Sequence, residues 1–91
     1  MTSRQQRAAQ NRRLVADLAM RGDEGRDLLL LCECGNERCG SRVRLTRRQY
    51  DRSRNSDDRF IVAPGHRQQN DAVMLVADDF WIVETRDQRE L

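Results

Sequence analysis

The chain has 91 residues, of which 37% are hydrophobic and 35% are charged, and its formal net charge is +2. This length predicts one small domain with a modest core, a size at which a structural metal often adds stability. No apolar run approaches the roughly 20 residues of a membrane-spanning helix, and the arginine-rich start has no apolar leader segment. We therefore expect a cytoplasmic protein with reduced thiols and no membrane partner.

The charge is unevenly distributed along the chain. All 17 basic residues are arginines. Residues 1–54 hold 13 arginines against 7 acidic residues, whereas residues 55–91 hold 4 arginines against 8 acidic residues. Such an asymmetry can mark an interaction face. The small net charge is not typical of strong nucleic-acid binders, and a GC-rich genome is the simplest explanation for the absence of lysine.

Residues 1–21 have the pattern of a helix, with Ser3 as the expected N-cap and Gly22 as the terminator. Apolar or small side chains recur at three- and four-residue spacing and form a narrow stripe: Ala8, Asn11, Leu14, Val15 and Leu18. The first turns are almost wholly polar. The favoured interpretation is a solvated helix that docks through its second half, and the alternative is an arm that binds a partner.

An apolar run predicts a buried strand over residues 27–34, and this strand ends in two cysteines. Residues two apart in a strand point to the same side. Cys32 and Cys34 should therefore present both sulfur atoms on one face, while Glu33 points away from them.

The next residues predict a hairpin. Gly35 and Asn36 form a strong turn signal because both residues tolerate a positive φ. The turn brings Cys39 back toward the first two sulfur atoms. Residues 41–45 alternate polar and apolar side chains, as a returning strand does. We expect a two-stranded, metal-tipped hairpin.

Thr46 and Gln49 match a capping box. They predict a short helix from Arg47 to about Arg54, with Tyr50 on its buried side. Three more strands are predicted at residues 60–63, 72–77 and 80–84, and the last two form a hairpin around Asp78-Asp79.

This order predicts an α+β domain with a mostly antiparallel sheet. We divide the chain into an arginine-rich helix and loop, a zinc-binding α+β domain and a loose tail, at residues 1–26, 27–85 and 86–91. The expected core is Leu29, Leu31, Val43, Leu45, Tyr50, Phe60, Val62, Val73, Leu75, Trp81 and Val83. Both faces of the last hairpin are apolar, which suits either a central position or an exposed docking surface.

The three cysteines and the single histidine make a complete tetrahedral set for zinc: Cys32, Cys34, Cys39 and His66. The rigid Pro64-Gly65 turn can present a fixed imidazole. A disulfide would leave one cysteine over, and an iron–sulfur cluster usually takes four cysteines. A redox thiol pair or inert buried cysteines would also account for the three thiols. We predict one structural zinc that closes the hairpin and pins the Pro-Gly-His turn against it.

The pattern Cys-x-Cys-x4-Cys followed by Pro-Gly-His resembles a family of small proteins from high-GC actinobacteria. The resemblance covers roughly residues 28–84 and includes Val43-Arg44-Leu45-Thr46, Tyr50, the strand before His66, and Ile82-Val83-Glu84. The family is largely uncharacterised, so the resemblance implies no reaction and no partner. It implies that the three cysteines and the Pro-Gly-His turn belong together. Residues 55–59 depart from the family, whose members tend to have a proline in this loop.

We expect a protein that is not an enzyme. Four protein ligands would close the zinc coordination, whereas a catalytic zinc keeps one position open. The sequence has no glycine-rich phosphate loop. Glu33 and Glu37 lie near the cysteines and are candidates for a base, but the simpler interpretation is that they are solvated turn residues.

The favoured function is a small zinc-stabilised regulatory adaptor that binds a protein partner through the first helix, the last hairpin and a group of arginines. These arginines are Arg42, Arg44, Arg47, Arg48 and Arg52. The first alternative is a nucleic-acid-binding module in transcription, which would use the same arginines together with Arg54. Aromatic residues are scarce, so base stacking on single strands is not favoured. The second alternative is a zinc-thiolate redox sensor, in which oxidation of the cysteines ejects the metal.

Overall fold

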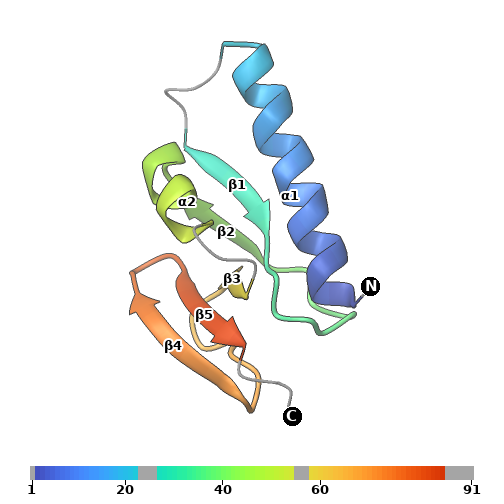
Figure 1. Ribbon diagram of the computed structural model, residues 1–91, viewed down its shortest axis with the longest axis vertical. Coiled ribbons are helices and arrows are strands. Elements are labelled where there is room, and N and C mark those ends of the chain that lie inside the picture. Colours follow the sequence, from blue (N-terminus) through green and yellow to red (C-terminus); the bar gives the residue numbers. More distant parts are fainter. Residues whose placement is uncertain (1, 23–26, 55–57, 86–91) are drawn as a thin grey trace.

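The computed structural model of the chain describes residues 2–22, 27–54 and 58–85. Its elements, in order, are α1 (Ser3–Met20), β1 (Leu28–Leu31), β2 (Arg42–Leu45), α2 (Arg47–Ser53), β3 (Arg59–Val62), β4 (Asp71–Val76) and β5 (Trp81–Thr85). The strands β1 and β2 form one antiparallel sheet, and a second antiparallel sheet has the order β3-β5-β4. The α+β class is thus confirmed, with the strands divided between two sheets. Figure 1 shows α1 alongside β1 and the three-stranded sheet at the opposite end of an elongated molecule of 43 × 27 × 26 Å.

Both helices begin with a capping box. At α2, the Thr46 hydroxyl accepts a hydrogen bond from the backbone amide of Gln49, and the Gln49 side-chain oxygen accepts one from the backbone amide of Thr46, as the sequence predicts. At α1 the cap is Thr2, which pairs with Gln5 in the same way. The prediction that Ser3 caps this helix is therefore wrong by one residue. Thr2 and Ser3 each have a glutamine three residues later, Gln5 and Gln6, so the capping-box pattern alone does not distinguish the two positions.

The inward face of β1 is the opposite of the one predicted. Leu28 and Leu30 are buried, whereas Leu29 is 53% exposed and Leu31 is half-buried. Cys32 is buried, and Leu28 and Leu30 lie four and two residues before it. Residues two apart in a strand point to the same side, so these two leucines point inward with Cys32. The predicted pair Leu29 and Leu31 is therefore a wrong assignment of the core.

The remaining core lies mostly where the sequence places it. Val43, Leu45, Tyr50, Phe60, Val62 and Val83 are buried, and Trp81 packs against them. The exceptions are in β4, where Val73 and Leu75 are exposed. The prediction that these two side chains lie in the core is wrong. They are exposed because β4 is the outer strand of its sheet, with β5 as its one neighbouring strand in the part of the chain that the structure describes.

Glu33 joins the two sheets. Its amide donates to the carbonyl oxygen of Ile61 in β3 at 2.8 Å, and the Ile61 amide donates to its carboxylate at 3.0 Å. The residues after β1 thus continue along the edge of β3. One edge of β1 pairs with β2, and the opposite edge contacts α1. There the side-chain amide of Asn11 makes hydrogen bonds to the backbone carbonyl and the backbone amide of Leu31.

Within the described residues, no helix combines the length and the apolar character that crossing a membrane requires. The predicted boundary after residue 26 and the predicted tail, residues 86–91, lie outside the described residues, as does most of the loop at residues 55–59.

Candidate metal centre

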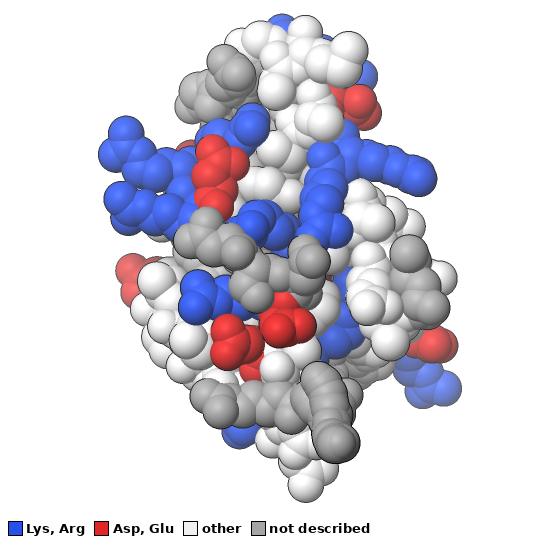
Figure 2. Space-filling model, in the orientation of Figure 1, with Lys and Arg blue, Asp and Glu red and all other residues white. Residues whose placement is uncertain are grey.

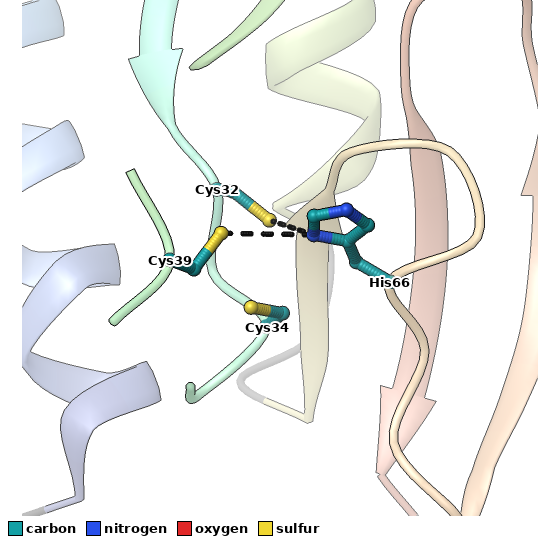
Figure 3. Close-up of side chains that lie close together, drawn as sticks. All are labelled: Cys32, Cys34, Cys39 and His66. Atoms are coloured by element: carbon teal, nitrogen blue, oxygen red, sulfur yellow. Dashed lines mark hydrogen bonds between the residues drawn. The ribbon is translucent and has the colours of Figure 1, made fainter. Parts of the chain in front are cut away.

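Four side chains from three separate segments converge at the junction of the two sheets. Cys32 and Cys34 directly follow β1, Cys39 follows the next turn, and His66 lies in the loop after β3. Figure 3 shows the side chains pointing toward one another. Their potential ligand atoms all lie within 4.8 Å of one another. The structure therefore brings together the four residues that the sequence predicts as metal ligands.

The spacing of this cluster fits a tetrahedral ion. Bonds of about 2.3 Å to sulfur and about 2.0–2.1 Å to nitrogen, at tetrahedral angles, place sulfur and nitrogen about 3.6 Å apart. The Nδ1 atom of His66 lies 3.6 Å from the Sγ atoms of both Cys32 and Cys39. The cluster of Cys32, Cys34, Cys39 and His66 could therefore hold a metal ion.

Two glycine turns position the ligands. Gly35 has a φ of +88° and Gly65 a φ of +83°, a region that suits glycine because it has no Cβ. In the first turn the Cys39 amide donates to the carbonyl oxygen of Asn36 at 3.0 Å. In the second turn the amide of His66 donates to the carbonyl oxygen three residues earlier, also at 3.0 Å. Each turn thus fixes the backbone beside a ligand.

The surroundings of Cys32 and Cys39 shift the pKa values of these two thiols in opposite directions. Burial raises the pKa of Cys32 to about 12, although the Ala63 amide donates to its sulfur at 3.2 Å and lowers the pKa. Burial also raises the pKa of Cys39, but hydrogen bonds from the Ser41 backbone, from Cys34, from the Ser41 side chain and from the imidazole outweigh it and lower the pKa to about 6. A divalent cation would favour the thiolate form of all the sulfur ligands.

Glu33, between two of the cysteines, is fully buried. Its carboxylate accepts hydrogen bonds from Asn11 in α1 at 2.6 Å and from the Ile61 amide, and it forms an ion pair with Arg54 after α2. The interpretation of Glu33 as a solvated turn residue is therefore wrong. It is a buried anion that connects α1, β3 and the end of α2 to the loop at residues 32–39, which we call the cysteine loop.

This network also corrects the role of Arg54. In the nucleic-acid alternative Arg54 belongs to an exposed basic patch, yet its side chain is 10% exposed and turned toward Glu33. One sequence signal for the pair was available. A glutamate within a run of buried residues needs a charged or hydrogen-bonding partner. The sequence does not say which arginine supplies it.

The first half of α1 binds the cysteine loop through polar contacts. Nε of Arg4 donates to the carbonyl oxygen of Glu33 at 3.0 Å. Nη1 of Arg7 donates to the carbonyl oxygens of Cys32 at 3.2 Å and Cys39 at 3.0 Å. The second half of α1 packs on the core through Val15 and Leu18, as expected. The contacts of the first half are not predicted from the sequence, because an apolar stripe does not reveal arginines that bind backbone carbonyl groups.

Asp71, at the start of β4, binds Arg4, one of the two arginines that contact the cysteine loop. Arg4 makes a two-pronged ion pair with its carboxylate at 2.9 and 2.8 Å, and the Gln68 amide donates to it at 2.9 Å. Burial raises the pKa of Asp71, but hydrogen bonds from Arg4 and the Gln68 amide, together with the charges of Arg4 and Arg67, leave the pKa below its usual value. The Gln68 side chain in turn donates to the carbonyl oxygen of Cys34.

The predicted partner-binding arginines lie on β2 and α2, apart from the contacts around the cysteine loop. Four of them are exposed: Arg42, Arg44, Arg48 and Arg52. Arg47 is half-buried and pairs with Asp51 on the next helical turn at 3.1 Å. In Figure 2 blue arginine surface lies on the side of the molecule where Figure 1 places α2.

The chain matches no family model, no curated protein and no solved structure. The resemblance to an actinobacterial family stays a prediction. The geometry of the cluster and of the surfaces around it therefore carries the functional argument.

Proposed function

We propose that this chain is a non-enzymatic regulatory adaptor that binds a protein partner and is stabilised by one structural zinc. The observation that carries the proposal is the cluster of three sulfur atoms and one imidazole nitrogen. Zinc in structural sites takes four protein ligands of these kinds in a tetrahedron, whereas softer or harder ions prefer other sets. With all four positions filled by side chains, no position remains for a water or a substrate. This argues against catalysis at the metal.

A structural role follows from which segments the ligands join. Cys39 and His66 are 27 residues apart in sequence. Bringing such segments together costs conformational entropy. An ion bound by both segments would offset this cost and tie the three-stranded sheet to the β1–β2 hairpin. The small core makes this contribution important.

The surface beside α2 suits a protein partner. A groove of about 550 Å³ between α2 and β4 has a rim that includes Arg52 and Arg59, and apolar side chains line it: Met74, Leu75, Phe80 and Ile82. Arg42, Arg44 and Arg48 add exposed positive charge on β2 and α2. These features complement a protein segment that carries both acidic and apolar side chains. We infer that such a segment is the partner.

Metal analysis of the chain purified without chelator tests the zinc assignment. We expect one zinc per chain, and loss of the metal in Cys32→Ser and His66→Ala. A chain that folds with free thiols and a zinc content near zero would overturn the assignment. Zinc release at a low dose of peroxide would instead favour the redox-sensor alternative.

Binding measurements with the zinc-loaded chain test the partner assignment. A peptide of alternating acidic and apolar residues is the probe, and Arg52→Gln should weaken its binding, while Arg13→Gln on α1 serves as the charge-matched control. Equal binding by both variants would contradict the assignment. Specific binding of duplex DNA at physiological salt, lost in Arg47→Ala with Arg48→Ala, would favour the nucleic-acid alternative.

A further inference from the structure

The strand β4 has an open outer edge. Among the described residues, the order β3-β5-β4 places only β5 beside it, whereas Glu33 covers the outer edge of β3. Four consecutive apolar side chains of β4 are exposed: Val73 at 39%, Met74 at 43%, Leu75 at 47% and Val76 at 65%. Within the described chain this is the longest run of exposed apolar residues. An edge strand of this kind is a template for pairing with another strand.

The hydrogen bonds define which part of the edge is free. At its start, the amide of Asp71 donates to Gln68 and its carbonyl oxygen accepts from Arg67, so this end is occupied by the chain's own loop. At its end, the Ala77 amide pairs with Phe80. Bonded and non-bonded pairs alternate in an antiparallel ladder. The backbone groups of Val76 therefore face away from β5 and toward the open edge.

The edge is complementary to itself when two copies run antiparallel. Residues 72–77 carry no charge. The one charged residue of β4 is Asp71, whose carboxylate is buried and paired with Arg4. Arg67 lies against the start of β4, and the exposed Asp78 and Asp79 follow its end. In an antiparallel pair the start of each strand lies beside the end of the other. Each Arg67 would then face the acidic turn of the second copy.

We propose that β4 pairs antiparallel with β4 of a second copy of this chain. The two three-stranded sheets become one continuous sheet around a twofold axis, and the contact closes at two copies because each edge is used once. The irregularity in the ladder between Val73 and Leu75 is local, and the pairing uses the residues on either side of it. This interface does not depend on the proposed adaptor function.

The arrangement favours a second copy over a strand of another protein. An apolar edge alone would accept any extended segment. The oppositely charged flanks favour a strand that runs antiparallel and has an arginine in the loop before it and acidic residues in the turn after it, as β4 has. Figure 2 shows uncharged surface at the left of the region where Figure 1 places β4, with acidic side chains to its right.

The first test is the mass of the zinc-loaded full chain in solution, measured by sedimentation over a range of concentrations. We expect twice the 10.7 kDa of one chain, falling to a single chain on dilution. Val76→Arg should remain a monomer, because it places two cations in the paired edge. Leu29→Arg, at a comparably exposed leucine of β1, is the matched control and should still dimerise. A wild-type chain that stays monomeric over this range overturns the proposal.

The second test uses the charged ends and decides the case if Val76→Arg fails to fold. Arg67→Asp and the pair Asp78→Arg with Asp79→Arg should each weaken the dimer at least tenfold, since like charges then face each other. Combining all three changes should restore it, because the signs are again opposite. If the dissociation constant of the dimer does not change in these variants, or if the combination does not restore it, the dimer forms through another surface and the proposal is overturned.

Discussion

The cysteine loop and the outer edge of β4 lie in one small molecule and are built in opposite ways. The loop after β1 has few apolar side chains of its own, yet Arg4, Arg7 and Glu33 satisfy its backbone and buried charges. The β4 edge is almost wholly apolar, yet its side chains are exposed. The comparison teaches that hydrophobicity alone does not locate the stable part of this fold. Polar contacts with buried partners define it, together with a cluster that could hold a metal ion.

The largest loss of stability should follow loss of the metal. Cys39→Ser removes one ligand of the cluster, and bound zinc contributes on the order of 10 kcal/mol in small metal domains. We expect the whole chain to lose its cooperative thermal transition, with the β4 edge affected as much as the loop. Melting curves with and without chelator measure this.

Two controls belong with that experiment. Chelator should unfold the wild-type chain and leave the Cys39→Ser chain unchanged. A Cys39→Ser chain that melts like wild type would show that the metal is not structural, and the catalytic and redox alternatives would gain support.

The buried carboxylate should have the next largest effect. Glu33→Gln leaves Arg54 buried without its anion, and breaking one partner of a buried ion pair costs about 3–5 kcal/mol. The matched control is Glu37→Gln in the same loop. The Glu37 side chain is exposed, so this change should cost less than about 0.5 kcal/mol. The free energy of unfolding in denaturant measures both.

This expectation reverses the one that the sequence alone supports, under which neither glutamate matters. Equal stability of Glu33→Gln and Glu37→Gln would remove the contrast between the loop and the edge. A double variant with Arg54→Gln completes a cycle, and a coupling energy near zero would show that the pair does not act as a unit.

The ion pair of Arg4 and Asp71 should make stability depend on pH. Because the folded pKa of Asp71 lies below its usual value, the carboxylate stabilises the fold above about pH 3.9, and this stability is lost as the pH falls through the folded pKa. Asp71→Asn should cost about 2 kcal/mol at neutral pH, the range for hydrogen bonds to a charged group.

The difference between two denaturation series, wild type and Asp71→Asn, isolates this group from the protonation of the metal ligands. Both proteins are measured with excess zinc from neutral to acidic pH. The difference should shrink toward zero at the acid end. A difference that stays constant with pH would mean that the charge of Asp71 is not what stabilises the fold.

Much of the site could be predicted because its signals are local. The cysteine spacing, the Pro-Gly-His turn and the Thr46–Gln49 capping box all lie within a few residues of what they specify. The inward face of β1 is also predictable from the sequence. If Cys32 and Cys34 point inward, Leu28 and Leu30 must point inward too, because residues two apart in a strand share a face. Placing the alternate leucines of this strand in the core was inconsistent with that.

The parts that could not be predicted depend on distant segments. The partners of Glu33 lie 21, 22 and 28 residues away, at Arg54, Asn11 and Ile61, and no spacing rule connects them. The exposure of Val73 follows from β5 being the central strand, which periodicity does not specify. Long-range polar contacts and strand order therefore had to come from the structure.

The smallest effect should come from the turn itself. Gly35 has a φ of +88°, and a Cβ there would lie 2.9 Å from Cγ of Arg4. Arg4 cannot swing away freely, since Asp71 and the carbonyl oxygen of Glu33 hold its guanidinium. Gly35→Ala should therefore cost about 1–2 kcal/mol from the left-handed backbone, with a further loss from displacing Arg4. Thermal denaturation of the zinc-loaded chain measures it.

Gly40, on the other side of Cys39, supplies the matched control. Its φ is not positive and a Cβ there meets nothing within 4 Å, so Gly40→Ala should change stability by less than about 0.5 kcal/mol. If both alanine variants lose the same stability, the clash with Arg4 is not what matters. If Gly35→Ala alone is destabilised and also binds zinc more weakly, the grip of α1 on the loop contributes to holding the metal.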